Sequence, residues 1–98
     1  MNLWETLKMK KKTKEETPQE ICERWLKTAI VDESTIGTKK FRAVLYNNLV
    51  KYGIHSIYDF CKADKALEIM LTGEYKKKEE KMRIWDIRKE VTENYFTK

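Results

Sequence analysis

The sequence is poor in residues that interrupt helices. Its 98 residues include three glycines and one proline. A β-sandwich needs many tight turns, and glycine and proline usually supply them. This scarcity disfavours an all-β fold and predicts an all-α protein. The length is that of one ordinary domain.

Long apolar runs are also missing. No stretch approaches the roughly 20 apolar residues that a helix needs to cross a bilayer. The start of the chain, Met1-Asn2-Leu3-Trp4-Glu5, lacks the apolar core of a signal peptide. We therefore expect a cytoplasmic protein that does not enter the membrane. Hydrophobic residues still make up 41% of the chain, which is enough for a globular core.

Residues that bind metals or act in catalysis are few. The two cysteines, Cys22 and Cys61, do not have the close spacing of a zinc site, and we expect both to be buried free thiols. The one histidine, His55, has Asp59 four residues later. Because a cap and the core explain the nearby Ser56 and Cys61, a catalytic triad is disfavoured. We expect His55 to be an exposed loop residue that could contact phosphate.

Motifs for cofactors and metals are absent as well. The sequence contains no GxGxxG, GxxxxGK[ST] or HExxH motif and no Asp-rich calcium loop. We predict that the protein is not an enzyme. On this prediction it has no catalytic residue, no cofactor, no metal and no small-molecule substrate.

The chain carries a moderate positive charge, with 21 Lys and Arg against 16 Asp and Glu, or +5. Such an excess is compatible with phosphate binding, and equally with a solvated surface rich in Lys and Glu. Five lysines crowd between Lys8 and Lys14, where like charges repel. We interpret residues 1–16 as a basic N-terminal arm, which could be flexible, and residues 17–98 as a single helical domain.

The first predicted helix has three start signals. Thr17 can cap it, Pro18 suits its first position, and Glu20 completes a capping box. Its end is expected near Val31. One face would carry Ile21, Trp25, Leu26, Ala29 and Ile30.

A second helix is predicted from about Lys39 to Tyr52, with Thr38 as its N-cap. Gly53 follows as the residue that ends the helix, and Ile54 is placed for the apolar contact that accompanies such an ending. The helical spacing of the apolar side predicts a stripe of Phe41, Val44, Leu45, Asn48, Leu49 and Tyr52.

Three further helices complete the expected fold. Ser56 and Asp59 form a capping box for a short helix that ends near Lys62. Asp64 can cap a fourth helix, which Thr72-Gly73 would break. A long last helix is predicted from Glu74 to about Tyr95, since this stretch contains no glycine or proline. The sequence thus predicts a compact domain of four or five helices with a long C-terminal helix.

A known family shares part of this pattern. The segment Tyr46-Asn47-Asn48-Leu49-Val50-Lys51-Tyr52-Gly53-Ile54-His55-Ser56-Ile57-Tyr58-Asp59-Phe60 resembles the carboxy-terminal domain of the bacterial RNA polymerase α subunit. The stretch 64–71 is similar to the family's intermediate helix, and Gly73 with Lys76–Lys78 is similar to its Gly-Lys-Lys-Ser hairpin. The resemblance covers about residues 38–90. It implies a helix-hairpin-helix element that binds the DNA minor groove and backbone and contacts transcription factors. Asn47 and the Gly73/Lys76–Lys78 region carry over.

We therefore predict a DNA-binding module with weak sequence preference in transcription, or one that docks on a transcription complex. Its expected phosphate-facing residues are Lys39, Lys40, Arg42, Asn47, His55, Lys76, Lys77 and Lys78.

Two alternatives stay open. One is a small protein-interaction module or inhibitor of the phage or mobile-element type, which would bind a host protein through Trp4, Tyr75 and Phe96 without contacting nucleic acid. The other is RNA binding through the arm from Lys8 to Lys14. The sequence leaves the oligomeric state open.

Overall fold

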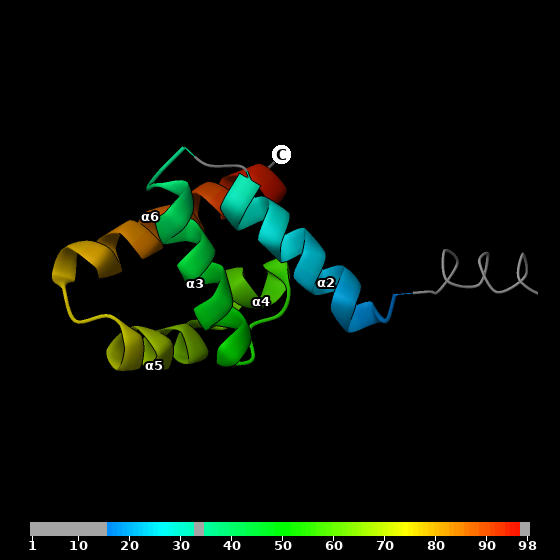
Figure 1. Ribbon diagram of the computed structural model, residues 1–98, viewed down its shortest axis with the longest axis horizontal. Helices are drawn as coiled ribbons and strands as arrows, with labels where there is room; N and C mark the ends of the chain where they lie inside the picture. The colour runs from blue at the N-terminus through cyan, green and yellow to red at the C-terminus, as the bar shows by residue number, and fades with distance from the viewer. Residues whose placement is uncertain (1–15, 33–34, 97–98) are drawn as a thin grey trace, which may run out of the picture.

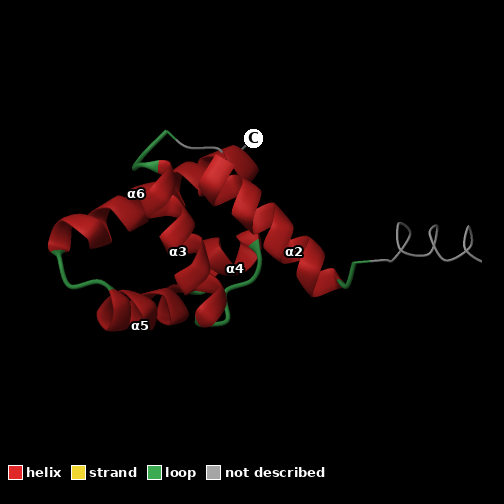
Figure 2. Ribbon diagram, in the orientation of Figure 1, coloured by secondary structure: helices red, strands yellow, loops and turns green. Residues whose placement is uncertain are grey.

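The computed structural model describes residues 16–32 and 35–96, which contain helices and loops and no strand (Figure 2). The all-α prediction is confirmed. In chain order the elements are α2 (Pro18–Lys27), the π-helix η1 (Thr28–Asp32), α3 (Lys39–Lys51), α4 (Ile57–Lys62), α5 (Asp64–Glu74) and α6 (Lys78–Phe96).

The helices surround one shared apolar core. α3 crosses the middle of the molecule, the linker from α5 to α6 lies at one end, and the start of α2 projects at the opposite end (Figure 1). The buried apolar residues are Leu26, Ala29, Ile30, Val31, Leu45, Leu49, Ile54, Phe60, Cys61, Leu67, Met70, Leu71, Tyr75, Ile84, Ile87 and Val91. Every described helix contributes to this set, so each is held by the burial of its apolar side.

Side-chain caps begin three of the helices, as the sequence predicts. The Thr17 hydroxyl accepts from the Glu20 N–H at 3.1 Å, and the Glu20 carboxylate accepts from the Thr17 N–H at 2.9 Å. Thr38 accepts from the N–H of Phe41 at 3.1 Å, and Ser56 accepts from the N–H of Asp59 at 3.0 Å. These bonds satisfy N–H groups that have no partner inside their own helix.

Gly53 ends α3 in the predicted way. Its φ is +86°, a left-handed conformation that side chains with a Cβ rarely adopt. The Gly53 N–H donates to the Val50 carbonyl at 3.0 Å and the Ile54 N–H to the Leu49 carbonyl at 2.8 Å, which is a Schellman motif. Ile54 is buried. The chain therefore turns sharply into α4.

The predicted break at Thr72-Gly73 is wrong, because α5 continues through both residues to Glu74. Gly73 serves close packing. A Cβ at this position would lie 2.8 Å from the hydroxyl oxygen of Tyr52. That hydroxyl donates to the Glu74 carboxylate at 3.0 Å. The missing side chain thus lets α3 and α5 approach each other.

Two other helix starts also differ from the prediction. Asp64 is the first residue of α5 and not its cap, and no side chain caps this helix. Its carboxylate instead accepts a hydrogen bond from Arg88 of α6. The last helix begins at Lys78 and not at Glu74, since Tyr75 has an extended backbone with φ −128° and ψ 125°.

The first predicted helix continues to Asp32, but it changes to a π-helix after Lys27. Its apolar face is only partly buried: Trp25 is 58% exposed and Ile21 37% exposed. The prediction of two buried thiols is half right, because Cys61 is buried and Cys22 is exposed. Cys22 lies in the half of α2 that projects beyond the core.

Candidate nucleic-acid interface

Three segments meet at the end of the molecule that carries the α5–α6 linker. The rings of Phe41, in α3, and Tyr75, in the linker, have centroids 6.2 Å apart. The guanidinium of Arg83, in α6, lies 5.1 Å from the Phe41 ring centroid. Tyr75 is 6% exposed and accepts a 2.9 Å hydrogen bond from Asn48 on its hydroxyl. This Phe41–Tyr75–Arg83 cluster joins the start of α3 to the linker and to α6.

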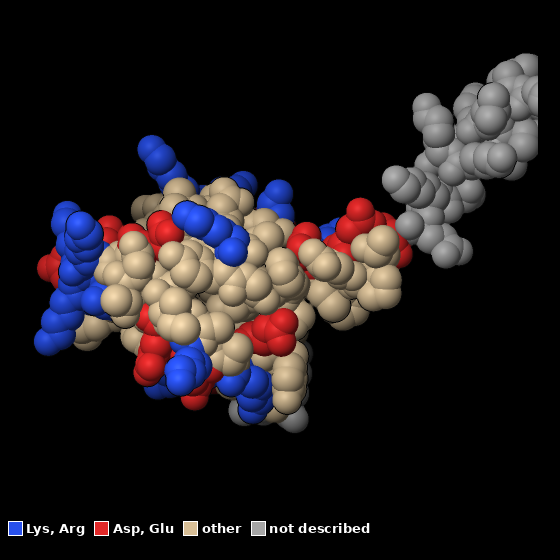
Figure 3. Space-filling model, turned by 90° about the horizontal axis from the view of Figure 1, so that it is seen from below, with Lys and Arg blue, Asp and Glu red and all other residues tan. Residues whose placement is uncertain are grey.

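The five predicted phosphate-facing lysines are close in sequence to two members of this cluster: Lys39 and Lys40 precede Phe41, and Lys76, Lys77 and Lys78 follow Tyr75. All five are exposed. None forms an ion pair with another described residue. Lys and Arg side chains gather at this end, with some acidic side chains among them (Figure 3). We refer to these five residues as the lysine surface.

The exposed face of α3 runs on from the lysine surface. Lys40, Val44, Asn47 and Lys51 follow one another at helical spacing, and each is exposed. The face stays close to the end of α5, because Lys51 Nζ lies 3.0 Å from Glu74 Oε2. Asn47 is therefore exposed as predicted, and its amide is free to bond a ligand.

The acidic residue of this face is held in its charged form. Hydrogen bonds from Lys51 and then Tyr52 lower the pKa of Glu74, and the same contact with Glu74 raises the pKa of Lys51. Glu74 also raises the pKa of Tyr52 through their hydrogen bond. The anion offsets part of the positive potential beside the linker.

Arg42 was predicted to face phosphate, and the structure buries it completely. Its guanidinium donates to the carbonyls of Ala29, Ile30 and Ile36, at 3.4 Å for Ala29 and 2.6 Å for Ile36. Nη1 also lies 3.2 Å from Glu90 Oε1. The C-terminal part of a helix has carbonyls without intrahelical partners. Arg42 therefore caps the end of η1 from inside.

His55 was predicted to be an exposed loop residue near phosphate, and the structure directs it elsewhere. Its side chain is 31% exposed, and Nδ1 lies 2.9 Å from Glu23 Oε2 in α2. Nδ1 is inaccessible to solvent and makes no well-directed hydrogen bond with the described residues. The pKa of Tyr46 is raised, mainly by burial of its ring and also by the negative charge of the same Glu23. His55 thus packs against α2 and does not join the lysine surface.

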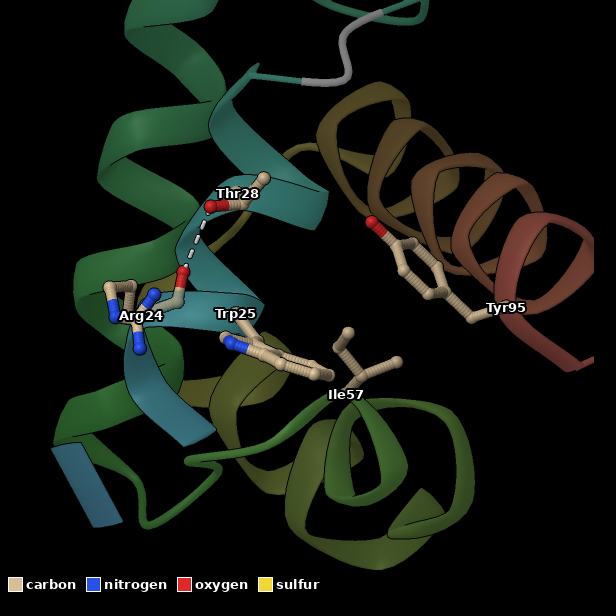
Figure 4. A pocket seen from close by; sticks show the side chains of 5 residues that line it. All are labelled: Arg24, Trp25, Thr28, Ile57 and Tyr95. Atoms are coloured by element: carbon tan, nitrogen blue, oxygen red, sulfur yellow. Dashed lines mark hydrogen bonds between the residues drawn. The ribbon is translucent and has the colours of Figure 1, made fainter. Parts of the chain in front are cut away.

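A shallow apolar groove, which the sequence did not predict, lies between α2, α4 and α6. It has a volume of about 190 Å³ and is lined by Arg24, Trp25, Thr28, Ile57 and Tyr95 (Figure 4). The sequence predicted that Trp25 shares one face of the first helix with Leu26, Ala29 and Ile30. The exposure of Trp25 could have been predicted, because the apolar residues of α2 cover too wide an angle around the helix for all of them to face the core. Leu26, Ala29 and Ile30 already fill the core side of the helix, which leaves Ile21 and Trp25 on the edge.

The aromatic residues predicted for protein contact have mixed positions. Tyr75 is buried, which corrects its predicted exposure, whereas Phe96 is 43% exposed. Trp4 and the lysines from Lys8 to Lys14 lie outside the described residues.

Other kinds of site find no support in residues 16–32 and 35–96. These residues contain no group of three or more His, Cys, Asp or Glu side chains placed to hold a metal ion. Within the same ranges, no helix has both the length and the apolar character that a membrane span requires. Comparison with protein-family models, with curated proteins and with solved structures found no match.

Proposed function

We propose that this chain is a non-enzymatic DNA-binding module of the transcription machinery, which contacts the phosphate backbone through the lysine surface and the exposed face of α3. The observation that supports this most is the Phe41–Tyr75–Arg83 cluster. It joins the start of α3, where Lys39 and Lys40 lie, to the linker that leads into Lys76–Lys78.

The chemistry of this surface favours weak sequence preference. Lysine ammonium groups bind phosphate as point charges, and contacts to phosphate position a protein without reading the bases. Asn47 is the amide on the exposed face that could bond a base edge. We therefore expect binding to depend strongly on salt and little on sequence.

A salt titration tests this proposal. Binding of the full chain to a fluorescently labelled duplex is measured by anisotropy between about 50 and 200 mM salt. Each phosphate contacted should lower the logarithm of the binding constant by about 0.9 per tenfold increase in salt. No binding at the lowest salt would contradict the proposal, and so would an affinity that does not change with salt.

Charge-reversal variants test whether the lysine surface is the part of the protein that contacts DNA. The triple variant Lys76→Glu/Lys77→Glu/Lys78→Glu should weaken binding strongly and reduce the salt slope. The matched control, Lys62→Glu/Lys65→Glu/Lys89→Glu, changes the net charge equally at exposed positions outside the lysine surface. Equal losses in the two triple variants would show a general charge effect and no interface. A larger loss on reversal of Lys8, Lys10 and Lys11 would move the site to the arm.

A further inference from the structure

The first half of α2 has few contacts with the rest of the molecule. From Glu16 to Trp25 every residue is exposed except the half-buried Glu23, and this part of α2 projects from the body (Figure 1). Isolated helices shorter than about 12–15 residues are marginal in water. The capping box stabilises the start of α2, but its apolar side lacks a partner among the described residues.

The uncovered side of α2 is continuous with the apolar groove. Ile21, Trp25 and Thr28 lie one above another at helical spacing. Trp25 points across the hollow toward Ile57, and Tyr95 approaches from α6 (Figure 4). This combined area is the α2 patch: Ile21, Trp25, Ile57 and Tyr95.

The charges beside the α2 patch change sign along the helix. Glu20 lies in the first turn, and Arg24 and Lys27 lie in the last turn. At helical spacing these three side chains line the same edge of the apolar stripe. Arg24 already pairs with Glu16, at 2.8 Å, but both side chains are about half exposed, at 55% and 44%, so this pair can exchange partners at little cost. An antiparallel copy of α2 would place its basic end opposite the acidic start.

We propose that the α2 patch binds a second copy of this chain, with the two α2 helices packed antiparallel about a two-fold axis near the level of Glu23. Ile21 and Trp25 of one copy then face Trp25 and Ile21 of the other. Glu20 lies opposite the basic turn that contains Lys27. Such an isologous contact buries the apolar stripe of each copy. It also pairs Glu20 of each copy with the basic turn of the other.

This dimer is separate from the proposed DNA contact. The start of α2 and the α5–α6 linker lie at opposite ends of the molecule (Figure 1). The dimer would leave a lysine surface free at each outer end. Failure of one proposal therefore leaves the other standing.

Mass measurement tests the dimer. Sedimentation equilibrium of the full chain over a range of concentrations should show a species of twice 11.8 kDa that dissociates on dilution. Trp25→Ala should weaken the dimer by roughly 10- to 100-fold, as expected for a central tryptophan. Circular dichroism checks that the exposed substitution leaves the fold intact. The matched control is Ile69→Ala, an apolar residue 55% exposed on α5, which should leave the dissociation constant unchanged.

The exposed Cys22 reports the orientation of the helices. It lies close to the proposed axis, so a short thiol cross-linker should join Cys22 of the two copies, while the buried Cys61 stays unmodified. Burial raises the pKa of the Cys61 thiol, which further reduces its reactivity. In a Cys22→Ser/Thr28→Cys variant, the two introduced thiols would be about 15 Å apart along an antiparallel pair, given the 1.5 Å rise per residue. They should not be joined by the short reagent.

Three results would overturn the proposal. A monomeric mass up to millimolar concentration would assign the groove to a different protein. A dimer that is insensitive to Trp25→Ala would place the contact elsewhere. Efficient cross-linking of the Thr28→Cys variant would indicate a parallel pair.

Discussion

Two cation–glutamate pairs connect α3 to other helices, and they differ mainly in burial. In the first, Arg42 pairs with Glu90 of α6, and the side chains are 0% and 11% exposed. In the second, Lys51 pairs with Glu74 at the end of α5, and the side chains are 63% and 24% exposed. The N–O distances are similar, 3.2 and 3.0 Å. Burial and the number of hydrogen bonds therefore decide what each pair does.

The buried pair is structural and the exposed pair is part of a surface. Arg42 also bonds the carbonyls of Ala29, Ile30 and Ile36, so its loss would leave several buried acceptors without donors. Lys51 and Glu74 keep contact with water, which weakens their attraction. A positive charge in this sequence can thus hold the fold together or remain available to a ligand.

The largest effect is expected from removal of the buried guanidinium. Arg42→Ala should lower the free energy of unfolding by about 3–5 kcal/mol, because Glu90 and the carbonyls lose their partner in the interior. Urea denaturation followed by circular dichroism measures this change. Lys40→Ala, on the exposed side of the same helix, is the control and should change stability by less than about 0.5 kcal/mol. Similar losses in the two variants would show that burial does not separate these cations.

A smaller effect is expected from neutralising the carboxylate of the same pair. Glu90→Gln should destabilise the protein by about 1.5–3 kcal/mol, the range for a hydrogen bond to a charged group. The carbonyl partners of Arg42 stay in place in this variant, and an amide oxygen can still accept the hydroxyl of Thr35, which now lies 2.5 Å from Glu90. A loss as large as that of Arg42→Ala would mean that the carbonyls contribute little.

The smallest effect is expected at the exposed pair, and it should depend on pH. The pKa of Glu74 is lowered in the folded protein. The contribution of the Glu74 carboxylate to the free energy of unfolding is therefore complete above the usual carboxyl pKa. It is lost as the pH falls through the lower pKa that Glu74 has in the folded protein. The urea midpoints of the wild type and Glu74→Gln should differ slightly at neutral pH and converge in acid. The matched control is Glu68→Gln, at an exposed position of the same helix.

Local sequence signals predicted most of the helix boundaries. Thr17, Thr38 and Ser56 cap their helices as expected, and Gly53 ends α3. These features depend on residues within one turn of each other. The errors at Gly73 and Asp64 arose because a glycine or a carboxylate also serves contacts between helices. Tyr52 occupies the space beside Gly73, and Arg88 binds Asp64.

The exposure of the residues named for the candidate interface was predicted in part. Lys39, Lys40, Asn47 and Lys76–Lys78 are exposed as expected. The sequence signals did not show that Arg42 is buried and Lys40 exposed, because both are cations in the first turn of the helix after Thr38. Their exposure differs because they point to different sides of α3. Arg42 lies on the side of α3 that Leu45 and Leu49 also bury, and an arginine can enter such a position where several carbonyls converge on it.

The amino-acid sequence by itself determined that the chain is helical and where most helices begin and end. These properties follow from short-range capping, turn conformation and the spacing of apolar residues. Only the tertiary structure decided which cations are buried, that the Phe41–Tyr75–Arg83 cluster joins the start of α3 to the linker and to α6, and that Trp25 remains exposed. Those outcomes depend on the packing of helices distant in sequence, because burial is a property of the assembled core and not of any single helix.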